Sequence, residues 1–168
     1  MLKKIFLAIM VAVPACMMAQ TPKFGVVNAE EIITILPEFS EAQEKIAAAS
    51  KQYEDEYAKL NEELQKKFAD YQQLVNDAST PDAIKERRMQ EIQELDQKAQ
   101  QFLQTAQQDL QRQQAQLLQP IQEKIVNTIK SVGANNGYTM IFQSEIPVYV
   151  STEVIDVTPD VKAALGVK

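Results

Sequence analysis

Three successive stretches decide the fold: IAAASKQYEDEYAKLNEELQKKFADYQQLV (46–75), DASTP (77–81) and IQELDQKAQQFLQTAQQDL (92–110). Around them, residues 38–119 contain no Gly and a single Pro, Pro81. Apolar residues recur three or four positions apart in both long stretches, which is the spacing of one helical face. Thr80 and Pro81 are typical of a helix start, as N-cap and first helical residue. The sequence therefore predicts a long antiparallel helical hairpin over 38–119, with its tip near 76–81.

Each arm of this hairpin carries only a narrow apolar stripe. From Ile92 to Ala106 the apolar residues are three, four, three and four positions apart, which is the seam of a coiled coil. We expect five aromatic side chains to close the seam between the arms: Tyr53, Tyr57, Phe68, Tyr71 and Phe102. Because a helix rises about 1.5 Å per residue, arms of about 40 residues give a hairpin about 60 Å long.

The second arm is rich in glutamine, with 14 Gln between residues 90 and 122. Such a composition also occurs in low-complexity, disordered segments. The helical reading is favoured here, because the apolar period continues through the Gln residues and Gln is a good helix former. A seam interrupted by Ala99, Ala106 and Gln113 buries little apolar area, so a weakly stable or mobile hairpin is expected.

Two shorter pieces, residues 20–37 and 120–168, flank the hairpin and contain the strand-like sequences. In the first piece, Lys23–Val27 is typical of a strand, and Asn28 is the expected N-cap of a helix that extends to Leu36. The second piece continues the second arm through Pro120, where we expect a kink. It then contains sequences for two strands (138–142 and 148–150) and a last short helix (161–165).

The fold class that follows is α+β, with the long antiparallel hairpin projecting from a small β-rich body. About 70 residues in two separated pieces are few for an independent core, so oligomerisation through the body is predicted. We assign the strand residues of the body to its core and to subunit contacts: Val26, Val27, Ile141, Phe142, Val148 and Val150.

The chain begins with features of a secretory signal peptide. Lys3 and Lys4 precede an apolar run that ends near Ala19, and this run is shorter than the ~20 residues of a membrane span. We expect residues 1–19 to be removed, with cleavage after Ala19. The alternative is lipoprotein processing at Cys16, because Val13–Cys16 is a loose lipobox-like string.

Composition excludes several classes of function. Without residues 1–19 the chain keeps 15 basic and 23 acidic residues and has no Cys, His or Trp. A net charge near −8 argues against nucleic acid, whose phosphates require basic patches. The usual zinc ligands and nucleophiles are missing, and the four Gly residues are too scattered for a phosphate-binding loop. We expect neither an enzyme nor a cofactor, and no carboxylate pair suggests a hydrolase site.

Several strings resemble the Skp (OmpH-like) family of periplasmic chaperones. FGVVN (24–28) with the short helix after it is similar to the start of that family, and KAQQF (98–102) is similar to part of its second arm. The helix running into GYTMIF (137–142) and the ending VIDVTPDV (154–161) are similar to its closing segments. The order of elements also matches, so the resemblance covers essentially the whole chain after the signal peptide.

The resemblance implies a periplasmic homotrimer whose three hairpins surround a cavity. This cavity would hold unfolded outer-membrane β-barrel proteins without using ATP. A two-helix hairpin leaves apolar residues beside its stripe uncovered, and exposed apolar patches usually mark binding sites. Four such residues are the candidates for client contact: Leu74, Met89, Leu103 and Leu118.

The charge of the arms departs from the basic members of the family. Residues 38–119 carry 16 acidic and 10 basic residues, which argues against binding of lipopolysaccharide. Lys85, Arg87 and Arg88 form the one basic cluster near the tip that could contact lipid phosphates. The competing hypothesis for the whole chain is a structural coiled-coil spacer or adaptor of the cell envelope. It predicts one defined partner at the tip instead of many unfolded clients.

Overall fold

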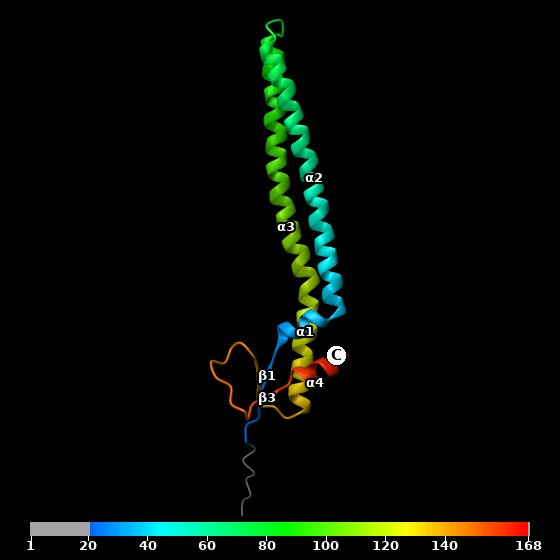
Figure 1. Cartoon of the computed structure of the whole chain (residues 1–168), viewed down its shortest axis with the longest axis vertical. Coiled ribbons are helices and arrows are strands. Elements are labelled where there is room, and N and C mark those ends of the chain that lie inside the picture. The colour runs from blue at the N-terminus through cyan, green and yellow to red at the C-terminus, as the bar shows by residue number, and fades with distance from the viewer. Residues whose placement is uncertain (1–20, 168) are drawn as a thin grey trace, which may run out of the picture.

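The computed structural model describes residues 21–167. The elements follow in the order β1 (Phe24–Val27), α1 (Ala29–Ile35), α2 (Pro37–Asn76), α3 (Asp82–Asn135), β2 (Met140–Gln143), β3 (Ile155–Asp156) and α4 (Thr158–Leu165). Helices α2 and α3 lie side by side as a long rod, and the other elements gather around one end of α3 as a small body (Figure 1). The α+β class with a projecting helical hairpin is therefore confirmed. The predicted signal peptide and the alternative at Cys16 lie outside the described residues.

The tip of the hairpin is organised by Asp77, which follows the last residue of α2. Its carboxylate accepts hydrogen bonds from Ser79 N at 2.9 Å, Ser79 Oγ at 2.7 Å and Thr80 Oγ1 at 3.1 Å. The expectation that Thr80 caps the second arm is wrong, because the residue preceding α3 is Pro81, which has no side-chain capping bond. Pro81 keeps an extended backbone (φ −61°, ψ 141°), which delays the helix start to Asp82.

The first short helix is capped as the sequence predicts. Asn28 Oδ1 accepts a hydrogen bond from Glu31 N at 2.9 Å, so the side chain satisfies a free amide of the first turn. Leu36 is extended and separates α1 from α2, and Pro37 takes the first position of α2. Ile32 and Leu36 are 0% and 1% exposed, which places this corner at the centre of the body core.

Helix α3 joins the hairpin to the body without a break. It contains Pro120 and continues beyond it to Asn135. Past the proline, Ile121, Ile125 and Val132 are buried in the same core cluster as Ile32 and Leu36. One end of α3 therefore packs in the body, while the other end packs only against α2.

The sheet has three parallel strands in the order β2-β1-β3, with β1 in the centre. In its register, Gly25 lies opposite Ile141 on one side and Ile155 on the other. The predicted strand at 148–150 is wrong, and the strand at Ile155–Asp156 was not predicted. Because β2 and β3 are parallel to each other, residues 144–154 must return the chain to the opposite end of the sheet. Val148 and Val150 belong to this connection, and Val148 is 106% exposed.

Within residues 21–167, none of the helices combines the length and the apolar character needed to cross a lipid bilayer.

Candidate functional site

One face of the sheet belongs to the core of the protomer. Val27 is buried in the core cluster, and Ile141 packs against it. Strand and helix approach closely here: a Cβ at Gly133 on α3 would lie 3.1 Å from Ile141 Cδ1. A Cβ at Gly25 would lie 3.1 Å from the Tyr138 ring. This face is filled by the chain's own helices and leaves no room for a partner.

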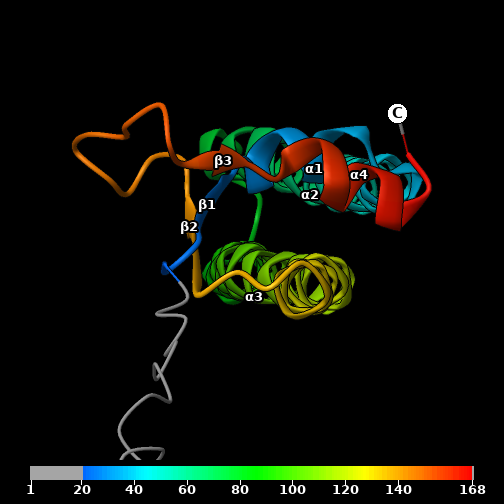
Figure 2. The ribbon, with the colours of Figure 1, turned by 90° about the horizontal axis from the view of Figure 1, so that it is seen from below.

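The opposite face of the sheet is apolar and open. Side chains alternate along a strand, so Phe24 and Val26 point away from the core that Gly25 and Val27 enter. Together with the connection 144–154 they surround a cavity of about 360 Å³. Its lining is almost entirely apolar: Phe24, Val26, Phe142, Ile146, Pro147, Tyr149, Val150 and Val154. Figure 2 shows this connection as a loop that stands out beside the sheet. We call this surface the apolar cup.

The six residues expected to mediate oligomerisation therefore separate into three groups. Val27 and Ile141 face the core of the protomer. Val26, Phe142 and Val150 line the apolar cup. Val148 projects from the loop into solvent. Contact with a second subunit stays a prediction for all six, and the geometry favours the cup and the loop over the two core residues.

The seam between the arms is built from aliphatic and aromatic residues of both helices. Leu60, Leu95 and Ala99 are buried there, with three half-buried partners packed against them: Tyr57, Leu64 and Phe102. The rings of Tyr53 and Phe102 lie 6.0 Å apart at a tilt of 59°, a favourable aromatic geometry. Of the five aromatic residues expected to close the seam, Phe68 is the least buried, with 47% of its surface exposed.

A polar contact also crosses the seam. The Tyr53 hydroxyl donates a hydrogen bond of 3.1 Å to Asp109 Oδ2. The Arg112 guanidinium contacts the other oxygen of the same carboxylate at 2.6 Å. The hydrogen bond to Asp109 raises the pKa of the Tyr53 hydroxyl, because the protonated phenol is the form that can donate. The helical period of the sequence does not reveal this contact, since it depends on the register between the two arms.

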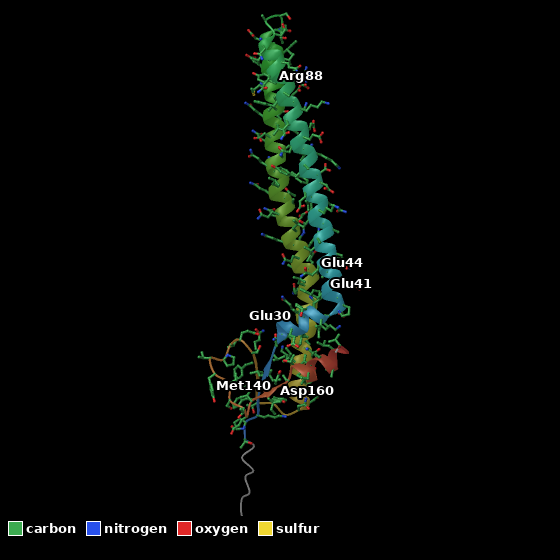
Figure 3. The ribbon with its side chains drawn as sticks, viewed as in Figure 1. Glu30, Glu41, Glu44, Arg88, Met140 and Asp160 are labelled. Carbon is green, nitrogen blue, oxygen red and sulfur yellow. The ribbon has the colours of Figure 1, made fainter. Side chains whose placement is uncertain are left out.

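Near the tip, the Glu91 carboxylate forms salt bridges with three basic side chains. Its carboxylate lies 2.7 Å from Arg88 Nη1, 3.3 Å from Arg87 Nε and 3.7 Å from Lys67 Nζ on the other arm. The hydrogen bond from Arg88 lowers the pKa of Glu91, with the charges of Lys67 and Arg87 adding to the effect. Figure 3 shows Arg88 on the arm close to the tip. Two of the three residues expected to contact lipid phosphates are thus already paired with a carboxylate, and the third, Lys85, is half-buried.

The four candidate client contacts are spread along the rod. Leu74 and Met89 lie half-buried near the tip, and Leu103, midway along α3, is 44% exposed. Leu118 packs against the body core. The arms also expose three apolar residues near the tip that were not among the candidates: Phe68, Val75 and Ile84. The four residues do not form one pocket, and their contact with a client stays a prediction.

At the base of the rod, a salt bridge ties the two arms together. Lys124 Nζ on α3 lies 2.5 Å from Glu38 Oε1 on α2. This hydrogen bond lowers the pKa of Glu38. Ala42, one turn further along α2, is 3% exposed and belongs to the body core. The base is therefore the best anchored part of the hairpin.

Among the residues that the structure describes, no group of three or more Cys, Asp or Glu side chains is placed to hold a metal ion.

Two comparisons place the chain among known proteins. The model of the family described as "Outer membrane protein (OmpH-like)" matches residues 23–165. A solved structure from Caulobacter crescentus, of a protein proposed to be an OmpH-like outer membrane chaperone, superposes with a TM-score of 0.72 at 14% identity. The match covers 86% of this chain and 84% of the other, and shows a shared fold. No curated protein matches the chain.

Proposed function

The chain belongs to the OmpH-like family of outer membrane proteins, and from this premise we propose that it is an ATP-independent periplasmic holdase chaperone. Its clients are unfolded outer-membrane β-barrel proteins, held between the helical arms of a homotrimer. The observation that carries the proposal is that the body presents an open apolar cup, while the long rod packs against the body only at its base.

The apolar cup supports self-association. A protomer that leaves Phe24, Phe142 and Tyr149 uncovered exposes a patch of the kind that marks an interface. The outer edges of β2 and β3 have no strand partner within the described protomer, and such edges readily pair with another chain. Three copies joined through their cups and edges would hold three rods on one base.

The arms support the holding of clients. Their seam is narrow, and apolar residues such as Phe68, Ile84 and Leu103 keep nearly half of their surface exposed beside it. Contacts of this kind are individually weak, so many of them together can retain an unfolded chain while each breaks easily. Release then needs no nucleotide, because folding of the client elsewhere removes the unfolded chain from the equilibrium.

The proposal is tested with the protein lacking residues 1–19. We expect native mass spectrometry to show three copies, and the trimer to suppress aggregation of several barrel proteins diluted from urea without nucleotide. A structural spacer or adaptor would instead leave every unfolded client to aggregate and would bind one folded partner. That result, or a monomer at micromolar concentration, would contradict the proposal.

A further inference from the structure

The face of α3 that points away from α2 carries a long row of glutamine. Ten positions, each three or four residues after the last, follow this face from Gln90 to Gln122, and nine of them are Gln. The exception is Ala115. These nine residues, all exposed, form what we call the Gln stripe: Gln90, Gln93, Gln97, Gln101, Gln104, Gln108, Gln111, Gln119 and Gln122.

The stripe lies opposite the seam. A helix turns about 100° per residue, so the ten positions fall within about 40° of one line along α3. Leu95, Ala99 and Ala106, which are buried against α2, fall on the other side of the helix. At about 1.5 Å per residue the stripe is about 48 Å long, most of the length of the arm.

The stripe is free of charge, although the chain as a whole carries a net charge of −6. The corresponding outward face of α2 bears four charged residues: Glu44, Lys51, Asp55 and Glu62. The amide groups of the stripe are also largely unused. Within residues 21–167, one stripe residue has a side-chain hydrogen bond, from Gln119 Nε2 to Glu123 Oε1 at 2.9 Å. A solvated face needs no such uniformity, since charged residues solvate a helix equally well.

We propose that the Gln stripe binds the extended backbone of unfolded clients, an inference that rests on the proposed function. Each Gln amide offers two donors and an acceptor oxygen, which match the N–H and C=O groups that an unpaired strand presents. The uncharged stripe is complementary to the uncharged peptide backbone, and it admits clients of either net charge.

The spacing of the stripe suits weak binding. Along α3 one amide recurs about every 5 Å, whereas the groups on one edge of an extended strand recur about every 7 Å. The two repeats cannot stay in register, so no single pose is favoured over the length of the stripe. Binding is then independent of client sequence and a bound segment can slide.

The test replaces the five central stripe residues, Gln97, Gln101, Gln104, Gln108 and Gln111, with Ala. Ala is the best helix former, so the arm is retained. The matched control replaces five Gln residues of α2 with Ala. These residues are exposed but do not form a row along the helix: Gln43, Gln52, Gln65, Gln72 and Gln73. The probe is a fluorescently labelled barrel protein diluted from urea into the whole chaperone, at low and high salt.

We expect the stripe variant to weaken client binding at least about tenfold, as the loss of several modest hydrogen bonds requires, and the α2 control to bind like wild type. Equal binding by both variants would overturn the inference and leave the proposed function intact. If the wild-type protein holds no client, the proposed function itself fails. If the stripe variant alone changes native mass without client, the stripe is a contact between copies and the inference is wrong.

Discussion

Tyr53 on α2 and Asp109 on α3 are joined by a hydrogen bond of 3.1 Å, 56 residues apart in sequence. The contact lies beside the ring of Phe102, where apolar packing continues along the seam. This hydrogen bond fixes the register of the two arms at a position outside the body. A seam as narrow as this one depends on such specific contacts, because its apolar area alone specifies register poorly.

Replacing Tyr53 with Phe should make the stability of the hairpin less sensitive to alkaline pH. The folded pKa of Tyr53 is raised, so its contribution is fully present below the unfolded pKa of about 10 and is lost as pH rises through the folded value. Urea unfolding, followed by circular dichroism at about pH 8 and above about pH 10, measures this difference. The Tyr57→Phe variant is the control, and identical pH profiles for all three proteins would contradict the prediction.

The hairpin should lose stability in acid. The pKa values of Glu38, Asp77 and Glu91 are lowered by their hydrogen-bond donors, which are Lys124, Ser79 and Arg88 respectively. Their contribution is present above the unfolded pKa of about 4 and is lost as pH falls through the lower folded values. Urea midpoints should therefore drop below about pH 4, and Glu91→Gln should flatten that drop. A midpoint in the Glu91→Gln protein that falls as steeply as in wild type would count against this assignment.

Phe142 and Ile141 should respond differently to the same substitution, although they are neighbours in β2. Phe142 lines the apolar cup, so Phe142→Asp should give folded protomers that fail to assemble. Ile141 packs in the core, so Ile141→Asp should destabilise the body by more than about 2 kcal/mol. Mass photometry together with thermal unfolding separates the two effects. A Phe142→Asp protein that still assembles at nanomolar concentration would show that the cup is not the interface.

Gly25→Ala should destabilise the body through a steric clash. The added Cβ would lie 3.1 Å from Tyr138 Cε1 and 3.2 Å from Val157 Cγ1, both tighter than ordinary contact. Overpacking of this kind costs about 1–3 kcal/mol, measured as the change in the free energy of unfolding. Gly137→Ala is the comparison, because its site is open and its cost of roughly 1 kcal/mol comes from the positive φ of 67°. If the two variants lose the same amount of unfolding free energy, the close approach at Gly25 does not add to the cost of the substitution.

The sequence by itself determined the helical elements, because their signals are local. The three-to-four residue spacing of apolar residues defines both arms, and the Asn28 cap is confirmed in the structure. The turn from Asn76 to Asp82 also needs only residues close in the chain. Signals of this kind are carried by hydrogen bonds and side-chain contacts within a few residues of each other.

Tertiary structure alone decided how the strands pair and everything else that depends on the register between distant segments. Val148–Val150 has the composition of a strand, but the parallel order β2-β1-β3 requires this segment to be the return connection. Ile155 and Asp156 pair with β1 because the chain brings them to its free edge. A segment of two residues is too short to show the alternating apolar pattern of a strand. The division of β2 into a core residue, Ile141, and a cup residue, Phe142, follows from where α3 lies. Such pairings join residues more than a hundred positions apart, and no local pattern can specify which of them meet.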